Sequence, residues 1–260
     1  MKFGLLGKEI SYSLSPNIFE TIATHMNIEI SYELFDVEER SIKSIIDKLK
    51  NGVVKGLNVT KPYKETILKY CDVLSSEAEA IQSVNTLVME NGHVKGYNTD
   101  IYGFEKLLLE SGFESVNPIY VFGNGGSSKA IAHVLNIRNL DYVIVKRKTS
   151  LKKNFHQKEI HYDEILAGEG LIIQTTTVGL DDKDVPLVNK ITLKDKNIID
   201  LIYHIPETIH MKLSKQSING ILMLIHQALK SFSIWTSLEV LNDQELINKV
   251  KDVLNRELNR

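Results

Sequence analysis

Residues 119–128 read Ile-Tyr-Val-Phe-Gly-Asn-Gly-Gly-Ser-Ser, a short apolar strand running into a glycine-rich turn, and Lys129 to Asn136 continue as a predicted helix. Strand, glycine-rich turn and helix in this order are typical of dinucleotide binding, because backbone N–H groups and the helix N-terminus face a pyrophosphate. Glycine turns before helices are common, so the motif gains weight from the residues that follow it. The candidate cofactor-binding residues of this turn are Gly123, Asn124, Gly125, Gly126, Ser127 and Ser128, the last standing at the third glycine position of the usual fingerprint.

A basic triplet, Lys146-Arg147-Lys148, follows the next predicted strand, Asp141 to Val145. In NAD-binding units an acidic residue at this place binds the ribose 2′-hydroxyl. Three cations could instead hold the 2′-phosphate of NADP, so the triplet favours NADP as the cofactor. The alternative is a solvated basic turn without a ligand.

Three more apolar segments are predicted to be strands: Leu171 to Gln174, Asn197 to Ile202 and Ser217 to Met223. The first two end beside polar or aromatic groups, Thr175 and Tyr203, and ligands bind at the carboxyl ends of strands in an open parallel sheet. The third strand is followed by a predicted helix, Leu224 to Trp235, which carries Gln227 near its start. Thr175 is therefore a further candidate cofactor-binding residue.

Composition and charge are those of an ordinary globular protein. The chain has 260 residues, enough for one large domain or two modest ones, and 43% of them are hydrophobic. Its 31 basic and 33 acidic residues give a net charge of -2, so no basic excess points to nucleic acid or a membrane surface. No apolar run approaches the roughly 20 residues of a membrane-spanning helix. We therefore expect neither kind of partner.

Cysteine and histidine usage argues against two further kinds of site. Cys71 is the only cysteine, so an intramolecular disulfide framework is excluded, which fits a reducing cytoplasm. The eight histidines are scattered, with no His-x-x-x-His spacing, and no Cys-x-x-Cys pair occurs. We therefore expect no metal site.

The N-terminal part alternates predicted strands and helices: Phe3 to Leu6, Asn17 to Met26, Ile28 to Leu34 and Glu38 to Lys50. A βαβα order implies parallel strands with helical crossovers, so the predicted fold class is α/β. Ser13 and Ser15 stand at the first strand-to-helix turn. Ser15 before Pro16 could simply be a helix N-cap, whereas two hydroxyls at a helix start could also hold a carboxylate.

The stretch Gly56 to Lys64 reads Gly-Leu-Asn-Val-Thr-Lys-Pro-Tyr-Lys and precedes a predicted helix, Glu65 to Tyr70. Pro62 suits the first turn of that helix, which would place Lys64 in or near the same turn. Asn58 and Thr60 stand just upstream, where a strand should end. The alternatives for Lys64 are a solvated surface lysine and an acid–base group beside two hydrogen-bonding side chains.

Residues 84–97 are predicted to form a hairpin around the turn Asn91-Gly92. Polar residues flank both ends of the hairpin, with Asn85 at one end and Asp100 just beyond the other. The two ends of a hairpin lie close together, so these groups should converge. Asp100 could cap the helix Ile101 to Glu110. The functional alternative is that its carboxylate is the partner of Lys64, holding the lysine and setting its protonation state.

With these motifs the chain resembles the shikimate dehydrogenase family over nearly its whole length. Four segments look like family signatures in the right order: Ser13-Leu14-Ser15-Pro16, Asn58 to Lys64, Val84-Asn85-Thr86 and Asn98-Thr99-Asp100. Two more lie towards the C-terminus: Tyr203 with Pro206 and Thr208, and Met223 to Gln227.

The resemblance implies a cytoplasmic enzyme, monomeric or homodimeric, that reduces 3-dehydroshikimate to shikimate with NADPH on the route to aromatic amino acids. It implies an α/β substrate-binding domain with a mainly parallel sheet (residues 1–100 with 225–260), a Rossmann-type NADP-binding domain (residues 101–224) and a cleft between them. Lys64 and Asp100 would be the catalytic pair, and Ser13 and Ser15 would bind the substrate carboxylate with help from Tyr203. The ring hydroxyls would be held by Asn58, Thr60, Asn85, Asp100 and Gln227.

The sequence departs from the family pattern chiefly on the cofactor side. The triplet Lys146-Arg147-Lys148 replaces Asn-Arg-Thr, residues Gln174 to Leu180 replace an Asn-x-Thr-Pro-x-Gly-Met loop, and Leu222 stands where glycine is expected. On the substrate side, Tyr12 stands where histidine is common. Two alternatives stay open here: a paralogue that acts on quinate with NAD, and a non-catalytic sensor of nucleotide and polyol. Retention of both Lys64 and Asp100 argues against the sensor.

Overall fold

The protein is described by a computed structural model that covers residues 1–146, 158–181 and 186–258. It divides into two compact units, the first made of Met1–Gly103 and Ile225–Arg260 and the second of Phe104–Leu224. The two boundaries fall inside helices α4 (Asp100–Ser111) and α8 (Ile221–Thr236). Among the described residues, no helix combines the length and apolar character needed to cross a membrane.

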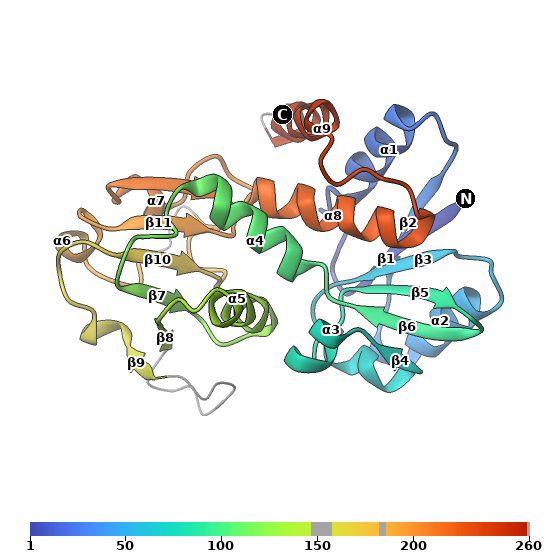
Figure 1. Cartoon of the computed structure of the whole chain (residues 1–260), viewed down its shortest axis with the longest axis horizontal. Helices are drawn as coiled ribbons and strands as arrows, with labels where there is room; N and C mark the ends of the chain where they lie inside the picture. The colour runs from blue at the N-terminus through green and yellow to red at the C-terminus, as the bar shows by residue number, and fades with distance from the viewer. Residues whose placement is uncertain (147–157, 182–185, 259–260) are drawn as a thin grey trace. The chain divides into compact units, whose positions relative to one another are not determined.

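A six-stranded sheet forms the centre of the first unit (Figure 1). Its strands are β1 Lys2–Gly7, β2 Ser31–Asp36, β3 Gly56–Val59, β4 Val73–Leu74, β5 Thr86–Glu90 and β6 His93–Tyr97. The spatial order is β2-β1-β3-β5-β6-β4. β1 is parallel to β2 and β3, whereas β5 is antiparallel to β3 and β6. The parallel part places the ends of β1 and β3, and the loops that follow them, side by side.

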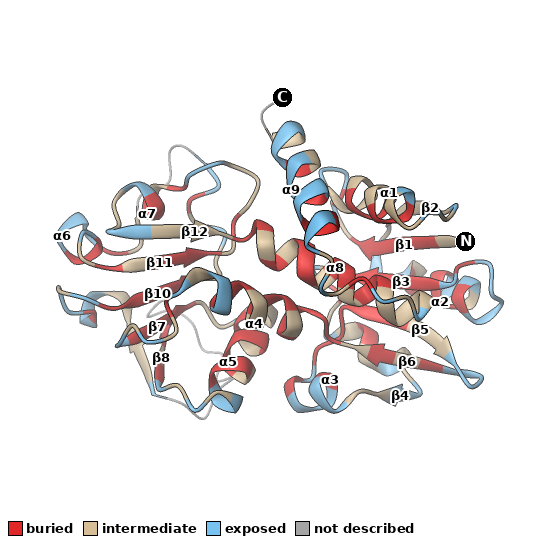
Figure 2. Cartoon of the chain, turned by 45° about the horizontal axis from the view of Figure 1, so that its top comes forward, coloured by how far each residue is buried: buried red, intermediate tan, exposed pale blue. Residues whose placement is uncertain are grey.

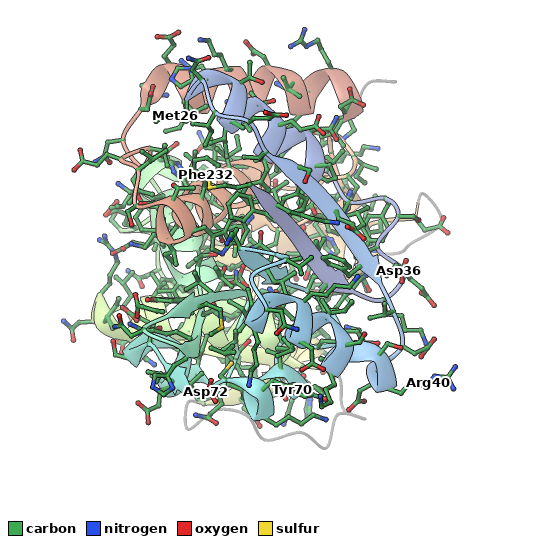
Figure 3. The ribbon with its side chains drawn as sticks, turned by 90° about the vertical axis from the view of Figure 1, so that its right-hand side faces the viewer. Met26, Asp36, Arg40, Tyr70, Asp72 and Phe232 are labelled. Atoms are coloured by element: carbon green, nitrogen blue, oxygen red, sulfur yellow. The ribbon has the colours of Figure 1, made fainter. Side chains whose placement is uncertain are left out.

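The helical elements of the first unit, besides its parts of α4 and α8, are α1 Ser15–His25, η1 Glu39–Ser41, α2 Ile42–Lys50, η2 Thr66–Tyr70, α3 Ser76–Ile81 and α9 Gln244–Leu258. The buried residues of α2 recur at helical spacing and join one core cluster with Leu6 and Leu57. Figure 2 shows β1 and β3 buried almost throughout, whereas α9 exposes its outer face. Figure 3 shows Phe232 of α8 among the interior side chains and Arg40 extending outward.

The second unit is built on a six-stranded, fully parallel sheet. Its strands are β7 Ile119–Phe122, β8 Tyr142–Lys146, β9 Glu159–His161, β10 Leu171–Gln174, β11 Asn197–Asp200 and β12 Gln216–Asn219. Its helical elements, besides its parts of α4 and α8, are α5 Gly126–Ile137, η3 Tyr162–Glu164, α6 Lys190–Leu193 and α7 Ile209–Lys212. In the order β12-β11-β10-β7-β8-β9, successive strands are added on one side of β7 as far as β9 and on the other side from β10 to β12. The point where the side changes, between β7 and β10, is the topological switch point. Such a switch point is where open α/β sheets bind ligands.

Several sequence predictions are confirmed. β7 and β10 have the predicted bounds. The hairpin of β5 and β6 turns at Asn91 and Gly92, which have φ values of 51° and 81°. Two positive φ values in a two-residue turn are the type I′ geometry that Asn-Gly favours.

Two local predictions are wrong. Residues 217–223 do not form one strand, because β12 ends at Asn219, whose side-chain oxygen accepts the Ile221 N–H (3.2 Å) as α8 begins. Leu222 is therefore helical. Likewise Lys64 does not lie in the first turn of an α-helix. The chain makes a tight turn there, with the Tyr63 N–H donating to Thr60 O over 2.9 Å, and only the short 3₁₀ helix η2 follows.

The second unit contains a buried cation that no sequence pattern predicts. Lys196 is 1% exposed, and its Nζ donates to three backbone carbonyls, those of Leu166 (3.0 Å), Gly168 and Glu169 (3.1 Å). Burial lowers the pKa of Lys196. The ammonium thereby fastens the loop that leads into β10.

We expect Lys196→Ala to lower the free energy of unfolding by about 2–4 kcal/mol, because it removes three charge-assisted hydrogen bonds and leaves a cavity. Urea unfolding followed by circular dichroism measures the change. Lys194→Ala is the matched control, since Lys194 is exposed and its loss should cost less than about 0.5 kcal/mol. Equal effects of the two substitutions would contradict the assignment.

Candidate active site

Ser13 and Ser15 lie where the turn after β1 enters α1. Ser13 Oγ donates to Ser15 Oγ over 3.1 Å and accepts the Ser15 N–H at 3.3 Å. The capping alternative for Ser15 is wrong, because α1 begins at Ser15 itself and Leu14, at the N-cap position, makes no side-chain hydrogen bond. Both serines are half-buried. Two adjacent hydroxyls at a helix start suit an anionic group such as a carboxylate.

Tyr32 of β2 connects this serine pair to β3. Its hydroxyl donates to Asn58 Oδ1 over 2.9 Å and lies close to the Ser15 side chain. Burial raises the pKa of Tyr32 well above its ordinary value, so the hydroxyl stays protonated at neutral pH. The ring stacks on Phe19 of α1, with the centroids 4.5 Å apart. Tyr32 therefore fixes the amide orientation of Asn58 from one side.

Asn58 occupies β3 and is 5% exposed. Its Nδ2 lies 3.1 Å from Thr86 Oγ1, 2.9 Å from Ser231 Oγ and 3.2 Å from Asn85 O. The register places Asn58 directly opposite Thr86. The backbone carbonyl of Asn85 can only accept, so the amide nitrogen of Asn58 must face this group.

Asn85 holds the two ends of the hairpin together. Its Oδ1 accepts the Thr99 N–H at 2.7 Å, which fixes the amide orientation. Its Nδ2 donates to Thr99 Oγ1 over 3.0 Å and to Asp100 Oδ1 over 2.8 Å. The predicted convergence of polar groups from both ends of the hairpin is confirmed.

Lys64 and Asp100 form an ion pair. Lys64 Nζ lies 2.5 Å from Asp100 Oδ2, and the two side chains are 21% and 10% exposed. The turn that carries Lys64 is fixed to the hairpin, since the Val84 N–H donates to Lys64 O over 2.8 Å. A partly buried, charge-assisted hydrogen bond of this kind is stronger than an exposed ion pair. The predicted pairing is confirmed, and each oxygen of Asp100 has a donor.

Helix α8 packs against the sheet through Trp235. Trp235 Nε1 donates to Leu87 O over 3.1 Å, and its ring stacks on Phe3 with centroids 4.7 Å apart. A side chain at Gly56 would collide with the Trp235 ring, so only glycine permits this approach. These contacts of Trp235 fix α8 on the sheet. Ser231 and Gln227 lie one and two turns earlier in the same helix.

The first part of the chain matches a known domain. A family model, the shikimate dehydrogenase substrate binding domain, matches residues 5–87. The shikimate dehydrogenase (NADP(+)) of Clostridium beijerinckii is 37% identical over 256 residues, covering 92% of this chain and 93% of that protein. The chain belongs to the shikimate dehydrogenase family.

Solved structures of the shikimate dehydrogenase family share the fold. The chorismate mutase/shikimate 5-dehydrogenase fusion protein from Clostridium acetobutylicum aligns with a TM-score of 0.91 at 31% identity, covering 100% of this chain and 98% of that one. Shikimate 5-dehydrogenase from Thermus thermophilus, in complex with NADP(H) and shikimate, aligns at 0.84 and 27%, covering 98% and 99%. The predicted two-domain α/β fold class is confirmed.

The glycine-rich turn of this family member lies after β7, at the switch point of the second sheet. Gly123 has a φ of +104°, and a side chain there would collide with Thr175, so glycine is required. Ser128 is buried, and its Oγ lies 2.7 Å from Thr175 Oγ1, which donates to Phe122 O over 2.5 Å. These two hydroxyls therefore close the turn. The N-terminus of α5, at Gly126, stands directly after it.

The basic triplet is described only at its first residue. Lys146 Nζ lies 2.5 Å from Glu159 Oε2, in a pair that is 11% and 17% exposed. Arg147 and Lys148 lie outside the described residues. A role for the three cations in holding a 2′-phosphate stays a prediction.

Tyr203 lies in the second unit, on the loop after β11, and its predicted contribution to substrate binding stays a prediction. The loop is fixed by Asp200, whose carboxylate accepts the Thr208 hydroxyl (2.7 Å) and the Ile202 N–H (3.1 Å). Burial raises the pKa of Asp200 to about 6.

We expect the raised pKa of Asp200 to appear in the stability of the protein. Between its ordinary value of 3.8 and about 6, the folded state keeps a proton that the unfolded chain releases. The free energy of unfolding should therefore fall as the pH rises through this window, by at most about 3 kcal/mol. Urea unfolding at several pH values measures the slope. Asp200→Asn should lose this component and Asp195→Asn, whose side chain is 46% exposed, should keep it; identical slopes in all three proteins would contradict the assignment.

Sequence reasoning missed two side chains of this site, Tyr32 and Ser231. For Ser231 a signal existed, because Gln227, Ser231 and Trp235 recur every four residues and so share one face of α8. No comparable signal marks Tyr32, since an aromatic residue in a strand is ordinarily part of the core. Among the described residues, no group of three His, Cys, Asp or Glu side chains is arranged to hold a metal ion.

Proposed function

We propose that this chain catalyses the NADPH-dependent reduction of 3-dehydroshikimate to shikimate, on the route to aromatic amino acids. The observation that carries the proposal is the Lys64–Asp100 pair, with 2.5 Å between Nζ and Oδ2, in a member of the shikimate dehydrogenase family. A lysine held by a carboxylate is suited to delivering a proton to an oxygen that gains negative charge.

The residues of the second unit fit a dinucleotide. The turn from Gly123 to Gly126 leads into the N-terminus of α5, where the N–H groups of the first helical turn and the partial positive charge suit a pyrophosphate. NADPH, when bound, supplies the hydride. Lys146, Arg147 and Lys148 would hold its 2′-phosphate, and for Lys146 this requires sharing its ammonium with Glu159.

The residues of the first unit would bind and orient the substrate. Ser13 and Ser15 would donate to its carboxylate, with Tyr203 assisting. Thr60 follows β3, next to the end of β1, because its N–H donates to Leu6 O over 2.9 Å. The ring hydroxyls would be held by Asn58, Thr60, Asn85, Asp100 and Gln227. Of these, Asn58 and Asn85 would share donors that already serve Thr86, Ser231 and Asp100.

Lys64 and Asp100 would handle the proton. As the carbonyl oxygen of the substrate becomes alkoxide-like, Lys64 Nζ donates a proton to it. Asp100 holds the ammonium through Oδ2 and is itself held through Oδ1 by Asn85. In the reverse direction the same lysine accepts the hydroxyl proton. Because the charge develops only in the transition state, this pair should contribute to kcat more than to substrate binding.

The domain roles, location and assembly belong to the same proposal. The unit of residues 1–103 with 225–260 would bind the substrate and the unit of residues 104–224 would bind NADPH, in line with the match of residues 5–87 to a substrate binding domain. We place the enzyme in the cytoplasm, as a monomer or a homodimer. Light scattering on purified protein distinguishes these two states, and a larger assembly would overturn the assignment.

The proposal is tested by measuring kcat/KM with four pairs of reactants: 3-dehydroshikimate with NADPH or NADH, and quinate with NADP or NAD. We expect the pair of 3-dehydroshikimate and NADPH to be the most efficient. Greater efficiency with NADH would contradict the role of the basic triplet, and greater efficiency with quinate would change the substrate. Absence of turnover in folded protein that binds shikimate would favour a sensor.

A further inference from the structure

Ser231 is the point at which two groups of site residues meet. It comes from α8, is fully buried and carries a hydroxyl within hydrogen-bond distance of three other side chains. The distances from Ser231 Oγ are 2.8 Å to Thr86 Oγ1, 2.9 Å to Asn58 Nδ2 and 3.1 Å to Thr99 Oγ1.

A helical serine commonly does no more than bond the carbonyl one turn back. Ser231 does make that bond, to Gln227 O over 3.0 Å. Thr236 of the same helix bonds Phe232 O in the same way, over 2.7 Å. Ser231 differs because its three additional neighbours come from β3, β5 and the segment between β6 and α4. A local helix role does not require these contacts.

Two chains of hydrogen bonds lead away from Ser231. One runs through Asn58 to Tyr32, whose hydroxyl lies close to Ser15, one of the two serines proposed to hold the carboxylate. The other runs through Thr99 and Asn85 to Asp100 and from there to Lys64. Each amide in these chains has a fixed orientation, because a backbone group decides which end faces inward. Each hydroxyl has only one proton, so removing one member forces its neighbours to rearrange.

The register of α8 on β3 explains why position 231 falls here. Gly56 lies against Trp235, and Asn58, two residues further along the strand, lies against Ser231, four residues back along the helix. Two strand residues span about 6.6 Å and four helix residues about 6 Å, so the two elements stay in step. Ser231 and Trp235 are therefore two matched positions of one register.

We propose that Ser231 is a positioning residue that fixes Asn58 and, through Thr99 and Asn85, the Lys64–Asp100 pair in one arrangement. The proposal rests on the proposed function. Ser231 does not itself donate to the substrate in this scheme. Its hydroxyl sets the direction of the groups that do, on both the carboxylate side and the proton-transfer side.

The test is Ser231→Ala in the full-length protein, assayed with 3-dehydroshikimate and NADPH. We expect kcat/KM for 3-dehydroshikimate to fall about 10- to 100-fold, because the residues proposed to contact the substrate would be misplaced. KM for NADPH should stay within about 2-fold of the wild-type value, because none of these residues is proposed to bind the cofactor. Ser233→Ala is the matched control, two residues along the same helix and half-buried. It should leave all constants unchanged.

A double-mutant cycle separates positioning from a general loss of stability. If Ser231 acts through Asn58, the penalty of Ser231→Ala should be at least about 3-fold smaller in an Asn58→Ala background than in the wild type. If Ser231 had only a structural role, Ser231→Ala would lower the melting temperature but leave kcat and KM of the folded enzyme unchanged. Unchanged kcat and KM would overturn the proposal. Equal penalties of Ser231→Ala in the wild-type and Asn58→Ala backgrounds would overturn it as well.

The wild-type assay keeps this test apart from the proposed function. Wild-type protein without turnover would reject the function, and the inference with it. Wild-type turnover together with an unaffected Ser231→Ala enzyme would reject the positioning role alone. Should Ser231→Ala fail to fold, Tyr32→Phe removes one hydroxyl from the Asn58 side while keeping the ring in its stack with Phe19. Unchanged kcat/KM in that variant would likewise count against the arrangement.

Discussion

Replacement of Lys64 by alanine is expected to lower kcat for 3-dehydroshikimate reduction by about 10²- to 10⁴-fold, the usual contribution of a positioned general acid. The substitution removes the group that neutralises the developing oxyanion and supplies its proton. Asp100 Oδ1 would still accept the hydrogen bond from Asn85 Nδ2. Steady-state kinetics with NADPH measures the loss, and titration calorimetry with shikimate measures binding.

Lys69→Ala is the matched control for this substitution. Lys69 lies five residues further along, in η2, and its exposed ammonium pairs with Glu39. The control should retain wild-type kcat. If Lys64→Ala kept kcat and lost only substrate affinity, the lysine would be a binding residue, and the proposed proton transfer would be wrong.

Asp100→Asn is expected to lower kcat by about 10²-fold or more, because the charge that holds Lys64 is lost while the size of the side chain is kept. The asparagine side chain has only one acceptor oxygen, so it cannot accept hydrogen bonds from Lys64 and Asn85 through two separate oxygens, as the Asp100 carboxylate does. Glu110→Gln, at an exposed position of the same helix, should leave kcat unchanged. The measurement is the same steady-state assay.

The two substitutions should not add. If Lys64 and Asp100 act as one unit, the enzyme with both changes should have a kcat within about 3-fold of the worse single variant. Multiplying penalties would show that the two residues act independently. That result would contradict a pair joined by a 2.5 Å contact.

The parts of the fold that could be predicted from the sequence are those with strong local signals. The Asn91-Gly92 turn specifies its hairpin through two positive φ values. The strands β7 and β10 are apolar runs whose bounds were found without error. The start of α8 was misplaced, because Ile221 to Met223 are as apolar as a strand and the signal is the single side-chain oxygen of Asn219.

The convergence of Asn85 and Asp100 could be predicted because a hairpin brings its two ends together, whereas the pairing of Asp100 with Lys64 was one of two alternatives that the sequence left open. The contribution of Tyr32 could not be predicted, since it depends on how β2 packs against β3, whereas the helical spacing of Gln227, Ser231 and Trp235 was a signal that went unused. Asp200 and Lys196 were missed for a related reason. Their importance comes from burial beside specific carbonyl, hydroxyl and N–H groups, and no local pattern in the sequence reports burial of a charged residue.

The central claim is that the Lys64–Asp100 pair serves the chemical step of an NADPH-dependent reduction. The most direct test is a single-turnover experiment in which enzyme loaded with NADPH is rapidly mixed with 3-dehydroshikimate, for the wild type and Lys64→Ala. We predict rapid oxidation of NADPH in the wild type and a rate at least about 10²-fold lower in Lys64→Ala. The variant should still bind shikimate in a separate binding measurement. Equal single-turnover rates in the two proteins would contradict the account.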